Sequence, residues 1–411
     1  MFRRRKLLPL EDRGPLRVMF VLTSMPVGGQ ETLTVELIRR LDRERFSPEL
    51  CCLKELGPLG AVLAREVPAH SGLLAGKWDL RVLERLVRLF RSRRVDAVVT
   101  VGAGDKMFWG RLAGWLAGVP VIASALHTTG YPDRVQRLNR PLAAVTDAFI
   151  AVAEAQGRYL AEHEGCTASK VRVIPNGIDV ERFHPRPPSR AILAELGLAP
   201  HPPSGSPPVV GIVAALRPEK NHALFLRAAA LVRRELPQAR FLVVGDGPQR
   251  APLEQLAGQL GLSDAVRFLG TRADVPEILS VVDLVLLTSH IEASPVSLLE
   301  AMASEKAVVA TRVGSVEEAV VDGRTGYLVP PGDADGLARR TLELLTRRDR
   351  AAAMGRAGRQ HVLGRWSLDQ MVRGYEDLIA GIYAAKAAEV AAAKPQAGAQ
   401  PAASATPSGK R

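Results

Sequence analysis

The sequence predicts an α/β protein with two doubly wound parallel-sheet domains. Apolar segments of strand length alternate with helical patterns along most of the chain, which is typical of parallel sheets covered by helices. A Pro-rich stretch at residues 186–208 interrupts this alternation, which then resumes. The chain has 411 residues, 47% of them hydrophobic, which suffices for two cores. We therefore expect two Rossmann-like domains joined by a linker.

The expected strands are the short apolar segments that end at turn residues. In the first half they are Leu16–Thr23, Asp96–Val101, Pro120–Ala125 and Ala148–Ala153. In the second half they are Val209–Ala214, Arg240–Val244, Val266–Leu269, Leu284–Thr288 and Ala307–Ala310. Between the first two strands, a Gly turn leads into a helix expected from about Thr32 to Leu41.

The domain boundaries follow from the same pattern. After a basic segment, 1–15, the first domain is expected at 16–185 and the second at 209–366. A late helix is expected at 367–386, with no strand after it. Residues 387–411 contain few large apolar side chains, so a disordered tail is expected there.

The stretch Trp78–Arg94 is basic and amphipathic. Its apolar residues Leu80, Leu83, Leu86, Val87 and Phe90 lie near one face of a helix. Two interpretations that do not exclude each other stay open. In the first, the helix covers a sheet through its apolar face. In the second, its basic outer face also contacts anionic lipid.

Composition favours a cytoplasmic protein with anionic ligands. Three scattered cysteines form neither a disulfide framework nor a metal motif, which fits a reducing compartment. The longest uncharged apolar run, Leu112–Leu126, is too short to span a bilayer, and no secretory signal is expected. The net charge of +12 suits phosphates or an anionic membrane. Nucleic acid is disfavoured, because only 5% of residues are aromatic and no nucleic-acid module is recognisable.

Glu292 and Glu300 bracket the expected start of a helix at Pro295–Ala303. Ser294 suits its N-cap, and Pro295 suits its first position. A helix N-terminus attracts anions, so carboxylates on both sides could accept hydrogen bonds from hydroxyls flanking a bound phosphate. A sugar nucleotide presents this combination. The spacing alone is common, and a solvated helix with acids near its start is the alternative.

Three further candidates follow expected strands, where doubly wound folds bind ligands. Lys220, in the loop Ala215–Asn221, could neutralise a diphosphate leaving group, or could lie on an exposed basic loop. Gly28 and Gly29 allow backbone N–H groups to approach a phosphate, although the three-glycine dinucleotide fingerprint is missing. His127 would face the Lys220 loop, or would be a structural histidine. The turns at 244–248 and 322–330 are expected to be structural.

Together these segments resemble the retaining glycosyltransferases of family 4 (glycosyl transferases group 1), which have the GT-B fold. The resemblance covers roughly residues 16–385 and is strongest over 171–335. The matching runs are Pro175–Asp179, Pro218–Asn221, Val244–Pro248, Phe268–Gly270, Glu292–Ala303, Ala307–Thr311 and Asp322–Pro330.

The resemblance implies a role for each candidate residue. Lys220 would contact the diphosphate, Glu292 the hydroxyls of the transferred sugar, and Glu300 the ribose. Four residues would meet the phosphates at the helix N-terminus: Ser294, Pro295, Val296 and Ser297. Other residues assigned to the donor site are Arg217, Asn221, Phe268 (facing the base), Gly28 and Gly29.

The remaining implications concern the other domain and departures from the family. His127 would face the transferred sugar or the acceptor, and the late helix would cross back onto the first domain. The family usually has an arginine at the position of Ala215, for which Arg217 is a candidate substitute. Glu305 and Lys306 stand where the family often has glycine and a small or apolar residue.

We therefore expect a retaining glycosyltransferase that uses a UDP- or GDP-linked sugar, without a further cofactor and without a metal ion. The expected acceptor is a cell-envelope, exopolysaccharide or lipid-linked glycan, reached at the inner face of the cytoplasmic membrane. Two alternatives remain open: a nucleotide-sugar epimerase of the same fold, and a non-catalytic protein that has kept the fold.

Overall fold

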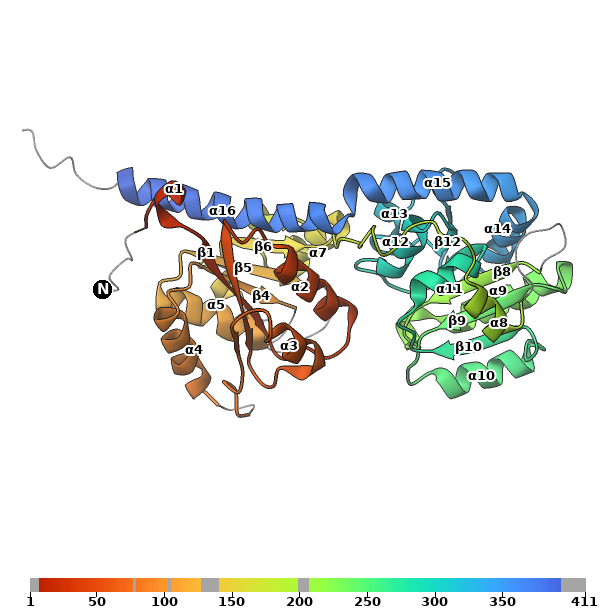
Figure 1. The fold of residues 1–411 in the computed structure, drawn as a ribbon, viewed down its shortest axis with the longest axis horizontal. Coiled ribbons are helices and arrows are strands. Elements are labelled where there is room, and N and C mark those ends of the chain that lie inside the picture. Colours follow the sequence, from red (N-terminus) through yellow and green to blue (C-terminus); the bar gives the residue numbers. More distant parts are fainter. Residues whose placement is uncertain (1–6, 77–78, 103–104, 127–139, 199–206, 393–411) are drawn as a thin grey trace, which may run out of the picture.

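The computed structural model describes residues 7–76, 79–102, 105–126, 140–198 and 207–392. Two α/β domains lie side by side, each built around one parallel sheet (Figure 1). The described strands of the first sheet are β1 (Leu16–Leu22), β2 (Phe46–Cys52), β3 (Ala69–His70), β4 (Ala97–Val101), β5 (Val121–Leu126), β6 (Ala148–Ala151) and β7 (Val171–Val173). Those of the second are β8 (Val209–Val213), β9 (Arg240–Val244), β10 (Val266–Gly270), β11 (Leu284–Leu287), β12 (Ala307–Thr311) and β13 (Tyr327–Val329).

Both sheets have the doubly wound strand order. The first runs β3-β2-β1-β4-β5-β6-β7 and the second β10-β9-β8-β11-β12-β13. The order therefore reverses between β1 and β4 in the first domain, and between β8 and β11 in the second. The prediction of two doubly wound domains is confirmed. Strands β2, β3, β7 and β13 were not expected from the sequence; β13 ends the 322–330 segment that was expected as a turn.

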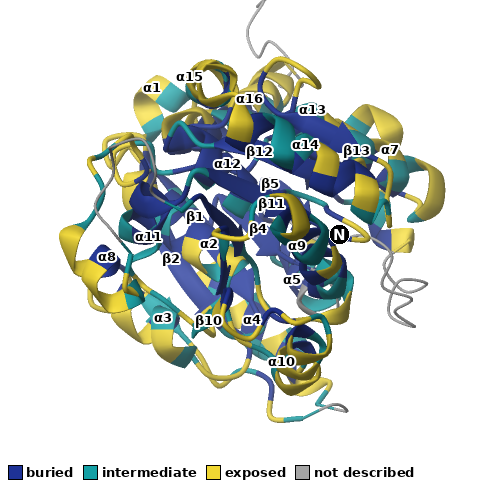
Figure 2. Cartoon of the chain, turned by 90° about the vertical axis from the view of Figure 1, so that its right-hand side faces the viewer, coloured by how far each residue is buried: buried dark blue, intermediate teal, exposed yellow. Residues whose placement is uncertain are grey.

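Helices cover both faces of each sheet. In the first domain they are α1 (Leu10–Arg13), α2 (Gly29–Arg40), α3 (Gly57–Leu63), α4 (Arg81–Ser92), α5 (Asp105–Ala117) and α7 (Glu154–His163). In the second they are α8 (Arg190–Leu196), α9 (His222–Glu235), α10 (Arg250–Gln259), α11 (Val275–Val281), α12 (Val296–Ala303), α13 (Val316–Ala319), α14 (Ala334–Thr346) and α15 (Arg348–Arg365). Figure 2 shows the buried strands between helices whose outer faces are exposed.

Alternation along β1 explains why the first sheet needs helices on both faces. Val18 and Phe20 belong to the core under α2, whereas Met19 and Val21 belong to the core under α4 and α5. Successive side chains of a strand point to opposite faces, so a strand that is apolar throughout requires cover on both.

The segment 186–208, expected as a linker, contains helix α8. The Ser189 hydroxyl accepts a hydrogen bond from the Ile192 N–H, and Gly197 ends the helix in the left-handed conformation. Ile192 and Leu193 pack into the core on one face of the second sheet. This part of the segment is therefore ordered structure attached to the second domain.

The chain crosses between the domains twice, and the two crossings lie side by side. The Ile178 N–H donates to the Trp366 carbonyl at 2.7 Å, and the Leu368 N–H donates to the Ile178 carbonyl at 3.0 Å. Gly177 makes this possible, because a Cβ there would fall 2.6 Å from Leu368 Cα. These bonds define the connection between the domains.

Helix α16 (Leu368–Ala392) confirms the predicted return to the first domain (Figure 1). Met371, Tyr375, Ile379 and Tyr383 join the core of the first sheet. The helix continues beyond the end expected at residue 386, and Ala387 is buried. The remainder of the expected tail, 393–411, lies outside the described residues.

Candidate active site in the second domain

The Lys220 and Glu292 loops flank the point where the strand order of the second sheet reverses. Lys220 follows β8, Glu292 follows β11, and these strands are neighbours. The carboxyl ends of parallel strands lie at one edge of a sheet, and loops that diverge at a reversal of strand order leave a crevice for a ligand. The two residues therefore meet where this fold binds ligands.

Lys220 and Glu292 form an ion pair in this crevice. Lys220 Nζ lies 2.7 Å from Glu292 Oε1, and the Ser289 hydroxyl donates to the same oxygen at 2.6 Å. Glu292 is only 6% exposed, so its charge needs these partners. Ser289 was not predicted from the sequence, although its position just after strand β11, where doubly wound folds bind ligands, could have indicated it.

Hydrogen bonds to backbone carbonyls join the two loops. The Thr288 hydroxyl donates to the carbonyls of Lys220 (3.1 Å) and Asn221 (3.0 Å). The His290 N–H donates to the Glu219 carbonyl at 2.8 Å. Asn221 has φ +48 and begins α9, so its clearest role in the structure is to make this turn.

A third loop, after β12, holds the backbone of Glu292. The Ser315 N–H donates to the Glu292 carbonyl at 3.0 Å. Gly314 has φ +52, and a Cβ there would fall 2.0 Å from the same carbonyl oxygen. Neither residue was a candidate in the sequence, because nothing local indicates which backbone a loop glycine approaches.

Helix α12 begins one residue later than expected. Pro295 is its N-cap, with ψ 66, and Val296 is its first residue, so the predicted N-cap at Ser294 is wrong. The N–H groups of Leu298 and Leu299 donate to the Pro295 carbonyl. The Val296 N–H already donates to the Ser294 carbonyl at 3.0 Å. The physical reason is that the chain turns tightly at 294–296 before the helical bonds start.

Glu300 lies within α12, partly buried. Burial raises the pKa of its carboxyl to about 7, and the nearby positive charge of Arg182 opposes this rise. Arg182 comes from the segment after the first crossing, where its Nη2 donates to the Ala273 carbonyl at 2.9 Å. Near neutral pH, Glu300 can therefore donate as well as accept a hydrogen bond.

The structure says less about the roles of the remaining candidate residues. Arg217 is exposed and makes no side-chain hydrogen bond or ion pair with a described residue. The Phe268 ring packs against the core under α9. Gly28 is the N-cap of α2, and no atom lies within 4 Å of a Cβ built at Gly29. His127 lies outside the described residues.

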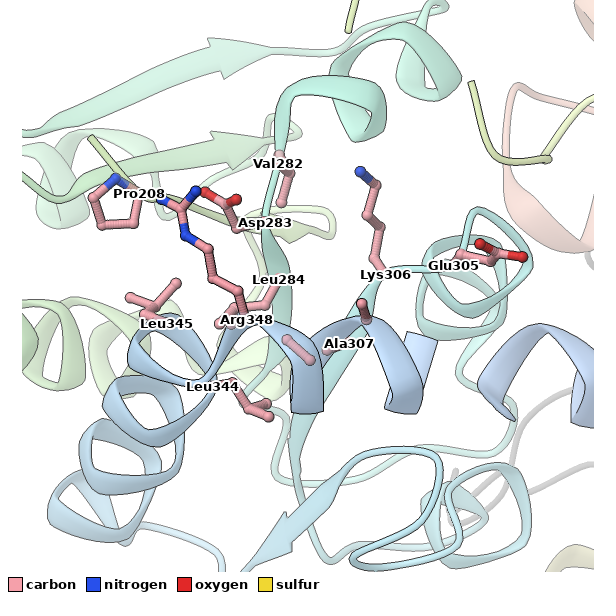
Figure 3. A pocket seen from close by; sticks show the side chains of 12 residues that line it. Pro208, Val282, Asp283, Leu284, Glu305, Lys306, Ala307, Leu344, Leu345 and Arg348 are labelled. Atoms are coloured by element: carbon pink, nitrogen blue, oxygen red, sulfur yellow. The ribbon is translucent and has the colours of Figure 1, made fainter. Parts of the chain in front are cut away.

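A cavity of about 220 Å³ lies at the opposite edge of the second sheet (Figure 3). Its lining includes Asp283 and Lys306, which precede β11 and β12, and Arg348 at the start of α15. Burial lowers the pKa of the Lys306 ammonium group. The Glu305–Lys306 departure from the family pattern is therefore remote from the Lys220–Glu292 pair.

Three broader features concern the described part of the chain. Among the described residues, no group of three or more His, Cys, Asp or Glu side chains is arranged to hold a metal ion. No described helix is both long enough and apolar enough to cross a membrane. The three cysteines are free and buried.

Comparison with known proteins identifies the family. The model for glycosyl transferases group 1 matches residues 198–361, and the model for glycosyltransferase family 4 matches residues 27–182. A GDP-mannose-dependent alpha-(1-6)-phosphatidylinositol monomannoside mannosyltransferase from Mycolicibacterium smegmatis is 33% identical over 350 residues, which cover 82% of this chain and 89% of the relative. A D-inositol 3-phosphate glycosyltransferase from Nocardia farcinica is 32% identical over 384 residues, which cover 86% and 82%.

Solved structures share the fold. Anabaena Alr3699/HepE, solved in complex with UDP, superposes with a TM-score of 0.77 at 22% identity, covering 89% of this chain and 100% of that one. With the sequence matches in both halves, the chain belongs to the group 1 glycosyltransferases and has the GT-B fold.

Proposed function

We propose that this glycosyltransferase moves a sugar from a UDP- or GDP-linked donor to an acceptor hydroxyl, with retention of the anomeric configuration. The main support is the Lys220–Glu292 pair at the reversal point of the second sheet. A cation and a buried carboxylate at adjacent strand ends match the two parts of such a donor, its diphosphate and its sugar hydroxyls.

Each residue of the pair keeps capacity for the donor. The Lys220 ammonium has three N–H groups, of which one donates to Glu292, so the others can reach a phosphate oxygen. Glu292 keeps its second carboxylate oxygen for a sugar hydroxyl. As the glycosidic bond breaks, negative charge grows on the diphosphate, and the preorganised Lys220 charge stabilises it without a metal ion.

Glu300 and α12 complete the proposed donor site. Glu300 holds the ribose, and the N-terminal turn of α12 lies towards the phosphates. The internal bond of the Val296 N–H leaves the Ser297 N–H as the better-placed donor of that turn. The diphosphate itself assists deprotonation of the acceptor from the same face of the sugar.

The proposed acceptor is a lipid-linked or envelope glycan at the inner face of the cytoplasmic membrane. The mycobacterial relative is named for a phosphatidylinositol-linked acceptor. In the first domain, an open groove of about 480 Å³ between α4 and α5 is lined by Leu80, Arg81, Leu83, Glu84, Val87, Arg91 and Leu116.

The groove presents apolar side chains beside basic ones. Leu80, in the lining, is 72% exposed, contrary to its expected place on the apolar face of the helix. Trp115 is not part of the lining, but it precedes the lining residue Leu116 in the sequence and is 51% exposed. Leu86 and Phe90 pack α4 onto the sheet as expected, together with Val82. Part of the basic charge is already neutralised, since Glu84 pairs with Arg88. Exposed apolar groups beside the remaining cations suit an anionic lipid surface.

Flotation with vesicles tests this surface. We expect the protein to float with anionic phospholipid vesicles at low salt and not with neutral ones, and Leu80→Ser with Trp115→Ser to weaken flotation. Absence of binding to anionic vesicles at low salt would contradict membrane contact.

A panel of UDP- and GDP-sugars tests the reaction. The true donor should raise the melting temperature of the wild-type protein through linkage, but raise that of Lys220→Ala much less. Transfer should then require an acceptor, and product NMR should show the anomeric configuration of the donor. Formation of an epimer from donor alone would instead indicate the isomerase alternative, and inversion would contradict the proposed stereochemistry.

A further inference from the structure

A carboxylate of the second domain caps a helix of the first. Glu318 lies on α13, and its Oε2 accepts a hydrogen bond from the Glu154 N–H at 2.9 Å. Its Oε1 accepts from the Ala155 N–H at 2.8 Å. Both N–H groups belong to the first turn of α7, so the contact joins the two domains directly (Figure 1).

Helix α7 needs this cap because it has none of its own. Its N-cap residue is Ala153, which has no side-chain acceptor. The first N–H groups of a helix have no partner within it, and the helix dipole favours a negative charge there. Glu318 supplies both acceptor and charge, but only while the domains are in this arrangement.

The same residue connects to the proposed sugar-binding carboxylate. The Glu318 N–H donates to the Ser315 carbonyl at 3.1 Å, and the Ser315 N–H donates to the Glu292 carbonyl at 3.0 Å. A short chain of hydrogen bonds therefore leads from α7 of the first domain to the backbone of Glu292.

The ion pairs at the connection between the domains differ from this contact. Arg40 of α2 pairs with Asp179 and Asp369, which lie on the segments that follow the two crossings. Those pairs secure the connection itself. Glu318 instead links the loop that holds Glu292 to an element of the opposite domain.

We propose that Glu318 is a positioning residue for sugar transfer, which fixes the arrangement of the acceptor domain against the donor site. This inference rests on the proposed function. Glu318 does not touch the reacting atoms in this scheme. It controls how far the acceptor domain lies from the sugar held by Glu292, and small displacements of reacting groups lower rates strongly.

The first test compares Glu318→Ala with Glu317→Ala. Glu317 is the neighbouring residue, and its ion pair with Arg312 stays within the second domain. We expect Glu318→Ala to lower kcat about 10- to 100-fold, with the Kd for UDP or GDP within about threefold of wild type, and Glu317→Ala to retain wild-type kcat. Equal kcat in the two variants, or loss of nucleotide binding in Glu318→Ala alone, would overturn the inference.

A second variant separates positioning from simple helix capping. Ala153→Ser places a hydroxyl at the N-cap of α7, where Ser is a good capping residue. In the Glu318→Ala background it should recover melting temperature without recovering kcat. Recovery of kcat would mean that Glu318 only stabilises α7, and would overturn the inference.

An interdomain distance provides a readout that does not depend on activity. Fluorescent labels on the two domains should show a longer or broader distance in Glu318→Ala than in Glu317→Ala, with UDP or GDP bound. An unchanged distance would contradict a positioning role. If wild-type protein transfers no sugar from any donor, the proposed function fails, while this distance still tests the Glu318 contact.

Discussion

Lys220 Nζ lies 2.7 Å from Glu292 Oε1, so two loops that follow neighbouring strands meet through opposite charges. The ion pair is asymmetric, because Glu292 is nearly inaccessible whereas the Lys220 side chain is 26% exposed. A lysine at the mouth of the site can reach an incoming phosphate, while the carboxylate behind it stays fixed. The two residues should therefore affect different parts of the donor.

Separate binding and rate measurements should divide these roles. Glu292→Gln should lower kcat by about 10²- to 10³-fold while UDP or GDP affinity stays within about threefold, because in the proposed site that carboxylate binds the sugar and not the nucleotide. Lys220→Ala should lower both. Calorimetry with the nucleotide and steady-state kinetics give the two readouts. Equal loss of nucleotide affinity in both variants would contradict the division.

The pH dependence of stability should reveal Glu300. Its folded-state pKa, about 7, lies above that of an unfolded glutamate, so the folded state binds the extra proton. Its contribution to stability is therefore full at low pH and is lost as pH rises from about 4.5 to about 7. As pH rises over that range, the free energy of unfolding of Glu300→Gln should increase relative to that of wild type, by at most ~3 kcal/mol. Denaturant unfolding at about pH 5 and about pH 8 measures the difference.

Glu343→Gln provides a comparison of opposite sign. The Tyr327 hydroxyl and Arg340 hold the pKa of the Glu343 carboxyl below its usual range. Wild type should therefore be more stable to unfolding than Glu343→Gln at neutral pH, and this difference should shrink as the solution becomes acidic. If the difference in unfolding free energy between Glu300→Gln and wild type does not change with pH, the pKa of the Glu300 carboxyl is not raised.

Gly314→Ala should damage the site through the backbone. A Cβ at Gly314 would fall 2.0 Å from the Glu292 carbonyl oxygen, and φ is +52. We expect at least about 2 kcal/mol of destabilisation, together with reduced transfer. Gly332 has φ +82 with no atom within 4 Å of its Cβ position, so Gly332→Ala should show only the conformational cost of about 1 kcal/mol. Similar losses in the two variants would contradict the contact with Glu292.

Gly177→Ala should disturb the connection between the domains. The added Cβ would fall 2.6 Å from Leu368 Cα and would push the two crossings apart. Transfer and melting temperature should both fall. Gly364→Ala is the control, since nothing lies within 4 Å of its Cβ position in α15, and alanine favours a helix there. Wild-type activity in Gly177→Ala would show that this close approach is dispensable.

The sequence predicted the sheets well because buried parallel strands are continuous apolar runs. The strand expected at Arg240–Val244 is β9 without change, and Leu16–Thr23 differs from β1 by one residue. Strand β2 was missed, since Ser47, Pro48 and Glu49 interrupt its apolar pattern. Helix α8 was missed because its cap residues, Ser189 and Gly197, stand inside a Pro-rich stretch that reads as a linker.

The site was only partly predictable, because its contacts join residues far apart in the sequence. Lys220 and Glu292 could be assigned to strand ends, and parallel strands then bring them to one edge of the sheet. Their pairing depends on which strands are neighbours, which the order of segments does not reveal. Gly314 and Glu318 act on partners 22 and 164 residues away, so no local pattern could identify them.

The paired crossings restrict how the two domains can move relative to each other. The bonds among Ile178, Trp366 and Leu368 join the two crossing segments to each other, so a movement that keeps these bonds must turn both segments together. We expect such paired segments to act as one hinge, which leaves the domains fewer relative orientations than a single crossing segment would allow. A distance measured between the domains would then report their rotation about that hinge during turnover.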